Sequence, residues 1–331
     1  MLAERDRWNA CRYRPGDPGG HYESYFQRAN HPSRPLAFWI RYTLFSPRGR
    51  RDEARGELWA IYFDGEQGRN VVVRESLPLA QCSFSDARLA VRIGSAELEE
   101  GRLSGSVASA RHTVGWTLRY ESPQPPLLLL DRSLYERSFP KAKVVIGSPN
   151  ALYTGTLVVN GVEVPVDGWR GSQNHNWGSR HTDRYAWAQV AGFDDDEEAF
   201  FECSTVRLRL GPLWSPWLTG MVLRLGGEEI RLNSIRQMLF AKGRYEPFTW
   251  SFSSSSAGTS IRGRVDAPPE AFVGLRYGNP PGGEKVCLNS KLARCELTVD
   301  RRGSARRVLT TRHRAAFEML SDTGWPGVSV G

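Results

Sequence analysis

Residues 168–206 read GWRGSQNHNWGSRHTDRYAWAQVAGFDDDEEAFFECSTV, and the second half of this stretch predicts a β-hairpin. Side chains there alternate at the period of two that a strand has. The pattern divides into a strand over 184–193, an acidic turn over 194–198 and a return strand over 200–206. Folding the chain at the turn places Glu202 across from Gln189 or close to it.

The first half of the stretch predicts a polar loop rich in aromatic residues, from Gly168 to Arg180, with His175 inside it. In the strand that follows, Tyr185, Trp187 and Gln189 share one face. Loop and hairpin together gather His, Trp, Tyr, Gln and Glu side chains in a small region. We therefore expect the functional centre of the chain here.

The rest of the chain predicts an all-β protein with two antiparallel barrels or sandwiches. Short alternating segments separated by Gly-containing turns fill both halves, and Asn160-Gly161 is the strongest hairpin signal. A proline-rich linker at Ser122 to Pro140 predicts the domain boundary, which gives an N-terminal domain over 1–130 and a C-terminal domain over 131–331 that carries the central motif. Residues 312–320 are expected to form a short helix.

Composition restricts the class of protein and its partners. The 331 residues carry a net charge of +8, and 39 of the 44 basic residues are arginines spread along the chain, which argues against a nucleic-acid binder. One basic tract, Asp300 to Arg314, leaves a peripheral membrane contact open. No apolar run is long enough to span a membrane, and the first residues do not resemble a signal peptide, so we expect a cytoplasmic protein. The sequence does not determine the oligomeric state.

Familiar cofactor and metal signatures are missing from the sequence. It contains no dinucleotide-binding glycine motif, no P-loop and no H-E-x-x-H, and its five cysteines are scattered without a C-x-x-C pair. His175 and His181 lack acidic partners at zinc-site spacing. We therefore expect no cofactor and no metal.

A second informative stretch begins at His21 and reads HYESYFQRANHPSRPLAFWIRYTLFSP. Its two predicted strands are interrupted by prolines, which cannot continue a ladder. The candidate ligand-binding residues of this stretch are polar or aromatic side chains on the two strands: Glu23, Tyr25, Arg28, Trp39 and Arg41. Asn174, Tyr185, Trp187 and Gln189 complete the candidate binding set.

These motifs carry a resemblance. The segment HYESYFQR is similar to a signature near the start of tocopherol cyclases. The pattern Gln-x-His-x-Trp-Gly, formed by Gln173, His175, Trp177 and Gly178, resembles the central motif of the lipocalin-like superfamily that includes carotenoid hydratases (hydroxyneurosporene synthases) and AttH-like proteins. The resemblance implies two lipocalin-like β-barrel domains around an apolar cavity. It also implies cofactor-free chemistry that protonates an alkene of a prenyl chain.

Carried over residue by residue, the resemblance implies catalytic roles for His175, Trp177 and Glu202. The chain departs from the hydratase pattern at the acid, because that pattern has an Asp preceded by a Tyr two residues earlier, whereas this chain has Glu202 and Phe200. A Phe cannot donate the hydrogen bond of a Tyr. The expected function is a cyclase, hydratase or isomerase, of lyase or isomerase type, acting on an isoprenoid- or polyketide-like molecule.

Each candidate also has a structural alternative. Alkene protonation needs an acid in an apolar cavity, and burial would favour the protonated form of Glu202 or Glu23. Glu202 is alternatively a carboxylate paired with Arg184, His175 a loop anchor, the tryptophans core residues, and Glu23 a partner of Arg41. Two other functions stay open for the whole protein. It is alternatively a non-catalytic carrier that holds a lipid or prenyl ligand in the cavity, or a scaffold whose cavities are filled by side chains.

Overall fold

The computed structural model describes residues 2–16, 18–325, 328 and 330, and it confirms an all-β protein. Strands make up 61% of the described residues. The described part of the chain has two α-helices, α1 (Leu2–Asn9) and α2 (Ile235–Phe240). Four short 3-10 helices complete the non-β elements: η1 (Arg51–Glu53), η2 (Leu79–Gln81), η3 (Arg132–Tyr135) and η4 (Pro269–Ala271). No helix among the described residues is long and apolar enough to cross a membrane.

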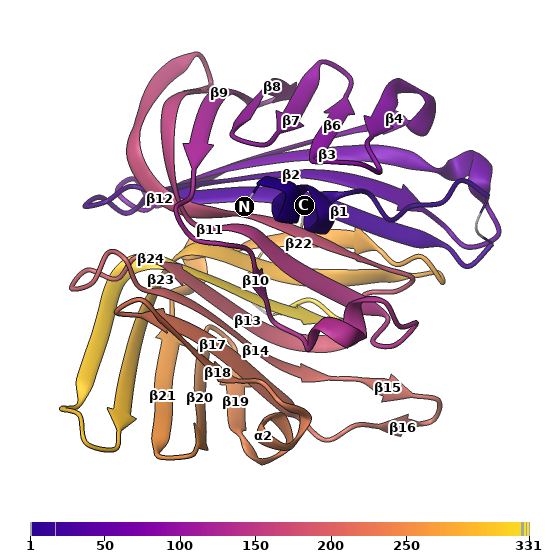
Figure 1. Ribbon diagram of the computed structural model, residues 1–331. Coiled ribbons are helices and arrows are strands. Elements are labelled where there is room, and N and C mark those ends of the chain that lie inside the picture. The colour runs from indigo at the N-terminus through magenta and orange to yellow at the C-terminus, as the bar shows by residue number, and fades with distance from the viewer. Residues whose placement is uncertain (1, 17, 326–327, 329, 331) are drawn as a thin grey trace. The chain divides into compact units, whose positions relative to one another are not determined.

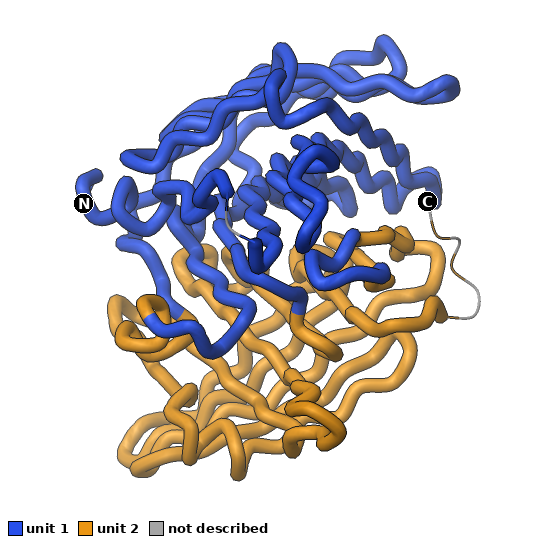
Figure 2. The backbone as a smooth tube through the Cα atoms, turned by 90° about the vertical axis from the view of Figure 1, so that its right-hand side faces the viewer, with its two compact units in different colours: residues 1–128, 137–181, 278–284 blue, residues 129–136, 182–277, 285–331 orange. Residues whose placement is uncertain are grey.

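The chain divides into two compact units, coloured separately in Figure 2. Unit 1 comprises residues 1–128, 137–181 and 278–284. Unit 2 comprises residues 129–136, 182–277 and 285–331. Each unit is built on one large antiparallel sheet with its own hydrophobic core.

The sheet of unit 1 follows the order β4-β3-β2-β1-β12-β11-β9-β8-β7-β6-β5, with β10 paired to β11. Its strands are β1 (His21–Asn30), β2 (Leu36–Ser46), β3 (Arg55–Asp64), β4 (Arg69–Pro78), β5 (Cys82–Phe84), β6 (Ala90–Ile93), β7 (Ala96–Glu99), β8 (Arg102–Ala108), β9 (Thr113–Glu121), β10 (Leu127–Leu128), β11 (Ala142–Val159) and β12 (Val162–Gly178). Figure 1 shows β11 and β12 as a long curved hairpin beside β9.

The turn of this hairpin is Asn160-Gly161, as its sequence predicts. Both residues have positive φ, 52° and 82°, which is what a two-residue type I′ turn requires. Val159 and Val162 pair directly on either side of the turn.

The sheet of unit 2 follows the order β18-β17-β14-β13-β24-β23-β21-β20-β19, with β22 paired to β23 and a separate small sheet of β15 and β16. Its strands are β13 (Arg184–Ala191), β14 (Phe200–Arg207), β15 (Arg209–Leu210), β16 (Leu213–Trp214), β17 (Leu218–Leu225), β18 (Glu228–Leu232), β19 (Lys242–Glu246), β20 (Thr249–Ser256), β21 (Thr259–Asp266), β22 (Val273–Gly278), β23 (Glu284–Arg301) and β24 (Arg307–Ser321).

The division into units differs from the boundary expected at residue 130. The motif strand β12 pairs with β1 along its length, with His175 opposite Tyr25, so the central motif belongs to unit 1. The prolines of the linker interrupt the sheet after β9, but the chain returns to the same sheet as β11. Pairing between strands far apart in sequence outweighs that local break.

Two further expectations for local structure are wrong. Residues 168–180 were expected to form a loop, yet β12 runs to Gly178 and has partners on both sides. Residues 312–320 were expected to form a helix, yet they belong to β24, which is paired with β13 and β23. In both segments ladder hydrogen bonds to two neighbouring strands override the local propensity of Asn, Gly, Ala and Leu.

Candidate functional site

Glu23 of β1 is the centre of a buried polar network in unit 1. Its side chain is fully buried and accepts hydrogen bonds from His175 Nε2 at 2.7 Å and His21 Nε2 at 2.8 Å. The backbone N–H groups of Arg12 and Tyr13 donate to the same carboxylate at 2.8 and 3.0 Å. Cys11 Sγ and the Tyr25 hydroxyl add longer contacts, each of 3.2 Å.

This network holds Glu23 in its charged form. Burial alone raises the pKa of a carboxyl, but the hydrogen bonds and charges of His175 and His21 more than offset it, so the pKa of Glu23 is well below its usual value. The expectation that burial keeps Glu23 protonated is therefore wrong. The physical reason is that several donors converge on the carboxylate.

His175 is engaged at both ring nitrogens. Nδ1 lies 2.8 Å from the Trp8 carbonyl oxygen and Nε2 lies against the Glu23 carboxylate. Both partners are oxygen acceptors, so each ring nitrogen has a polar partner inside the protein. The ring stacks on Tyr25 at 4.3 Å and on Trp177 at 4.6 Å between centroids. These two ring contacts help to fix the orientation of the imidazole.

The Glu23–His175 pair anchors the N-terminal segment, residues 8–13, to the sheet. Asn9 adds a reciprocal pair of bonds with Gln173, at 2.9 and 3.1 Å. This arrangement matches the structural alternative for His175, an anchoring residue, although the anchor lies on a strand and not on a loop.

Four other candidates in unit 1, namely Arg28, Trp39, Arg41 and Asn174, lie on the opposite face of the sheet. Alternation along β1 places Glu23 and Tyr25 with the core, whereas Arg28 shares the second face with its cross-strand partner Trp39. Arg41 and Asn174 lie on that second face too, both opposite Phe26. Arg41, the alternative partner of Glu23, therefore lies on the sheet face opposite to Glu23.

In unit 2, Glu202 and Gln189 are directly opposite each other in the β13–β14 hairpin, as predicted. Glu202 is fully buried, and its two oxygens accept hydrogen bonds from Trp187 Nε1 at 2.6 Å and Gln189 Nε2 at 2.9 Å. Arg184, the alternative partner suggested by sequence, stacks on Trp214 at 4.8 Å instead. Cys203 packs in the core, as its alternation indicates.

Sequence reasoning missed a second charged group on the same sheet face as Glu202. Glu318 of β24 is directly opposite Trp187, and it pairs with Lys291 of β23 at 2.8 Å. Asn289 and Tyr185 also donate to Glu318, each at 3.2 Å. The ammonium of the fully buried Lys291 lies 5.6 Å from the Trp187 ring centroid.

No local signal in the sequence connects these residues with the hairpin. Glu318 and Lys291 follow Trp187 by more than a hundred positions, and only the pairing of β24 with β13 and β23 brings them together. Burying a charged lysine destabilises a fold unless the ammonium has a charged or hydrogen-bonding partner. We call this side of the sheet the unit 2 polar face, which carries Tyr185, Trp187, Gln189, Glu202, Lys291 and Glu318.

The predicted site residues thus divide between the units. Trp177 and His175 lie in unit 1, and Glu202 lies in unit 2. A common cavity for all three stays a prediction. Among the described residues, no group of three or more His, Cys, Asp or Glu side chains is placed to hold a metal ion.

The two large antiparallel sheets define an all-β protein. No protein-family profile matches the sequence. The Mycobacterium tuberculosis proteins MT0513 and Rv0493c are each 27% identical over 322 residues, which cover 94% of this chain and 90% of theirs.

Solved structures share the fold over nearly the whole chain. A protein assigned as AttH from Nitrosomonas europaea superposes with a TM-score of 0.58 and 13% identity, covering 95% of this chain and 97% of its own. Kievitone hydratase from Nectria haematococca gives 0.60 and 10%, covering 94% and 91%. CghA in complex with Sch210972 gives 0.55 and 14%, covering 92% and 90%. The fold expected from the sequence motifs is confirmed.

Proposed function

We propose that the protein is a cofactor-free enzyme of the hydratase, cyclase or isomerase type that acts on a hydrophobic isoprenoid- or polyketide-like molecule. The observation that carries the proposal is Glu202, fully buried and held by the neutral donors Trp187 and Gln189. The shared fold of kievitone hydratase, a hydratase by name, supports the same reaction class.

Glu202 is the proposed proton donor. Donors that carry no charge hold both carboxyl oxygens in position before and after the proton leaves, as acid–base catalysis requires. Burial disfavours the charged carboxylate, whereas the hydrogen bonds from Trp187 and Gln189 favour it, so the two effects on the proton oppose each other. The nearby Lys291 ammonium faces Glu318 at 2.8 Å, so the two carboxyl groups have different surroundings and different proposed roles.

The proposed reaction is balanced without a redox step. An alkene carbon takes the proton from Glu202, and the resulting carbocation is stabilised by the π-faces of Trp187 and Tyr185. Water then adds to the cation, an internal nucleophile closes a ring, or an adjacent C–H bond breaks. In each outcome one proton returns to the Glu202 carboxylate.

In this proposal His175 and Trp177 are positioning residues. Both ring nitrogens of His175 are already engaged, with the Trp8 carbonyl and the Glu23 carboxylate. Moving its proton would break the contact that anchors residues 8–13.

The test is Glu202→Gln, which keeps the shape of the side chain but cannot deliver a proton. The purified protein is incubated with a lipid extract of its host in deuterated water, and products are followed by mass spectrometry. Wild type is expected to yield products with carbon-bound deuterium, and Glu202→Gln is expected to yield none while still retaining extractable ligand. Glu57→Gln, which changes a buried carboxylate paired with Arg55 and Arg74, is the matched control.

A ligand that both proteins retain and release unchanged would contradict the enzymatic proposal and favour a carrier. Full turnover by Glu202→Gln would show that another residue donates the proton. Lower thermal stability of Glu202→Gln with unchanged turnover would identify Glu202 as a structural carboxylate.

A further inference from the structure

Two arginines stand directly opposite each other where β13 begins and β14 ends. Arg184 pairs with Arg207 in the hairpin register. Directly opposed like charges destabilise a sheet. Among the described residues no carboxylate forms an ion pair with either guanidinium, so this repulsion is not cancelled within the described protein.

Aromatic rings support both guanidinium groups. The Arg184 group lies 4.8 Å from the Trp214 ring centroid. The Arg207 group lies 5.4 Å from Trp214 and 5.5 Å from Trp217. Each such contact holds the cation in place without neutralising it. The two positive charges are therefore positioned and remain available.

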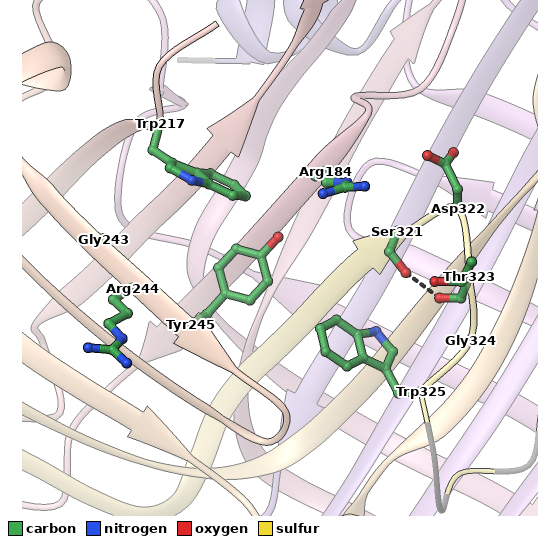
Figure 3. A pocket seen from close by; sticks show the side chains of 10 residues that line it. All are labelled: Arg184, Trp217, Gly243, Arg244, Tyr245, Ser321, Asp322, Thr323, Gly324 and Trp325. Atoms are coloured by element: carbon green, nitrogen blue, oxygen red, sulfur yellow. Dashed lines mark hydrogen bonds between the residues drawn. The ribbon is translucent and has the colours of Figure 1, made fainter. Parts of the chain in front are cut away.

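Arg184 lines a pocket of about 520 Å³ in unit 2, shown in Figure 3. Trp217, Tyr245 and Trp325 form its aromatic walls, and the rings of Trp217 and Tyr245 meet nearly at right angles, at 86° and 5.4 Å. This volume lies in the range of small-molecule sites.

The pocket lies at the end of the core face of the unit 2 sheet. Alternation along β13 puts Arg184 on the side of Ala186 and Ala188, which belong to the core. Ligands commonly bind at the open end of a β-barrel.

The charges of Arg184 and Arg207 act on the hydroxyl of Tyr245, which lies in the pocket wall. Burial raises the pKa of Tyr245, and the charges of Arg184 and Arg207 partly offset that rise. The other charged groups of the pocket already have partners: Arg244 pairs with Glu246 at 2.9 Å, and Asp322 pairs with Lys285.

We propose that this pocket binds a small amphipathic carboxylate. The ligand's carboxylate meets the Arg184 guanidinium and the Tyr245 hydroxyl, with Arg207 contributing charge, and its apolar body lies between Trp217 and Trp325. A guanidinium fork matches carboxylate geometry. The proposal is independent of the chemistry proposed for Glu202.

The probe is 2-naphthoate, compared with its uncharged analogue 2-naphthamide by calorimetric titration at low salt. Naphthoate is expected to bind at least about tenfold more tightly, which corresponds to ~1.4 kcal/mol. Arg184→Gln is expected to remove that preference. Arg244→Gln is the matched control, because Arg244 lines the same pocket but is paired with Glu246. It should change the affinity by less than about threefold, as a rim charge does.

Thermal melting provides a second readout that a purely structural role would not give. Arg184→Gln removes both the like-charge contact with Arg207 and the stacking on Trp214, so only a small change of the melting temperature without ligand is expected. Naphthoate is expected to raise the melting temperature of wild type and not of Arg184→Gln. Equal affinity for naphthoate and naphthamide, absence of saturable binding, or a clear drop in melting temperature for Arg184→Gln would each overturn the proposal. Glu202→Gln should bind naphthoate like wild type, which separates this site from the proposed reaction.

Discussion

His175 Nε2 lies 2.7 Å from Glu23 Oε1, and both side chains are fully buried. The pair joins the C-terminal end of β12 to β1, and His175 of β12 lies directly opposite Tyr25 of β1. Through Trp8 and the backbone of Arg12 it also fixes the N-terminal segment. A buried charge with this many partners is costly to leave unpaired.

Replacing Glu23 with Gln is expected to destabilise the protein by ~3–5 kcal/mol, because the negative charge is lost and an NH2 donor replaces one of the two acceptor oxygens that His175, His21 and the backbone N–H groups contact. Urea unfolding measures the change. The matched control is Glu99→Gln, which removes an exposed ion pair with Arg102 and is expected to cost less than ~1 kcal/mol. Equal costs for the two variants would show that the Glu23 network contributes no special stability.

The same carboxylate predicts an acid-sensitive stability. The pKa of Glu23 is lowered in the folded protein from a usual value of 4.5, so its contribution is fully present above that value. As the pH falls below it, the unfolded state binds the proton first and the contribution is lost towards the lower folded pKa. Urea unfolding between about pH 6 and about pH 3 should therefore show a steeper loss for wild type than for Glu23→Gln. Parallel curves for the two proteins would contradict this.

The Lys291–Glu318 pair is expected to respond to the loss of one partner more than to the loss of both. Lys291→Met leaves the Glu318 carboxylate without its ammonium and should cost ~3–5 kcal/mol. The double variant Lys291→Met with Glu318→Gln should lose less unfolding free energy than the two single variants lose together. A double-mutant cycle by urea unfolding measures the coupling. Additive costs would mean that the 2.8 Å contact contributes nothing in solution.

Gly171 is expected to tolerate no side chain, because β1 and β12 approach closely there. A Cβ at this position would lie 1.7 Å from the Arg28 carbonyl oxygen. Gly171→Ala should therefore cost more than ~4 kcal/mol or prevent folding, which circular dichroism and expression yield report. The comparison is Gly161→Ala, where no atom lies within 4 Å and only the positive φ of 82° is strained, so about 1 kcal/mol is expected.

The sequence by itself determined the features that depend on neighbouring residues. Turn residues at Asn160-Gly161, the alternation of β13 and β14 and the acidic turn between them predicted an all-β chain and the pairing of Gln189 with Glu202. These features follow from side-chain period and from backbone conformations that Gly and Asn allow.

Only the tertiary structure decided how distant strands meet. Because β12 pairs with β1, the segment expected to be a loop forms a strand, and His175 lies beside Glu23. For the same reason the central motif belongs to unit 1. The pairing of β24 with β13 made a strand of the expected helix and brought Glu318 to Trp187. Hydrogen bonding between strands and the burial of their polar side chains depend on partners more than a hundred residues away, and no local pattern encodes which partner that is.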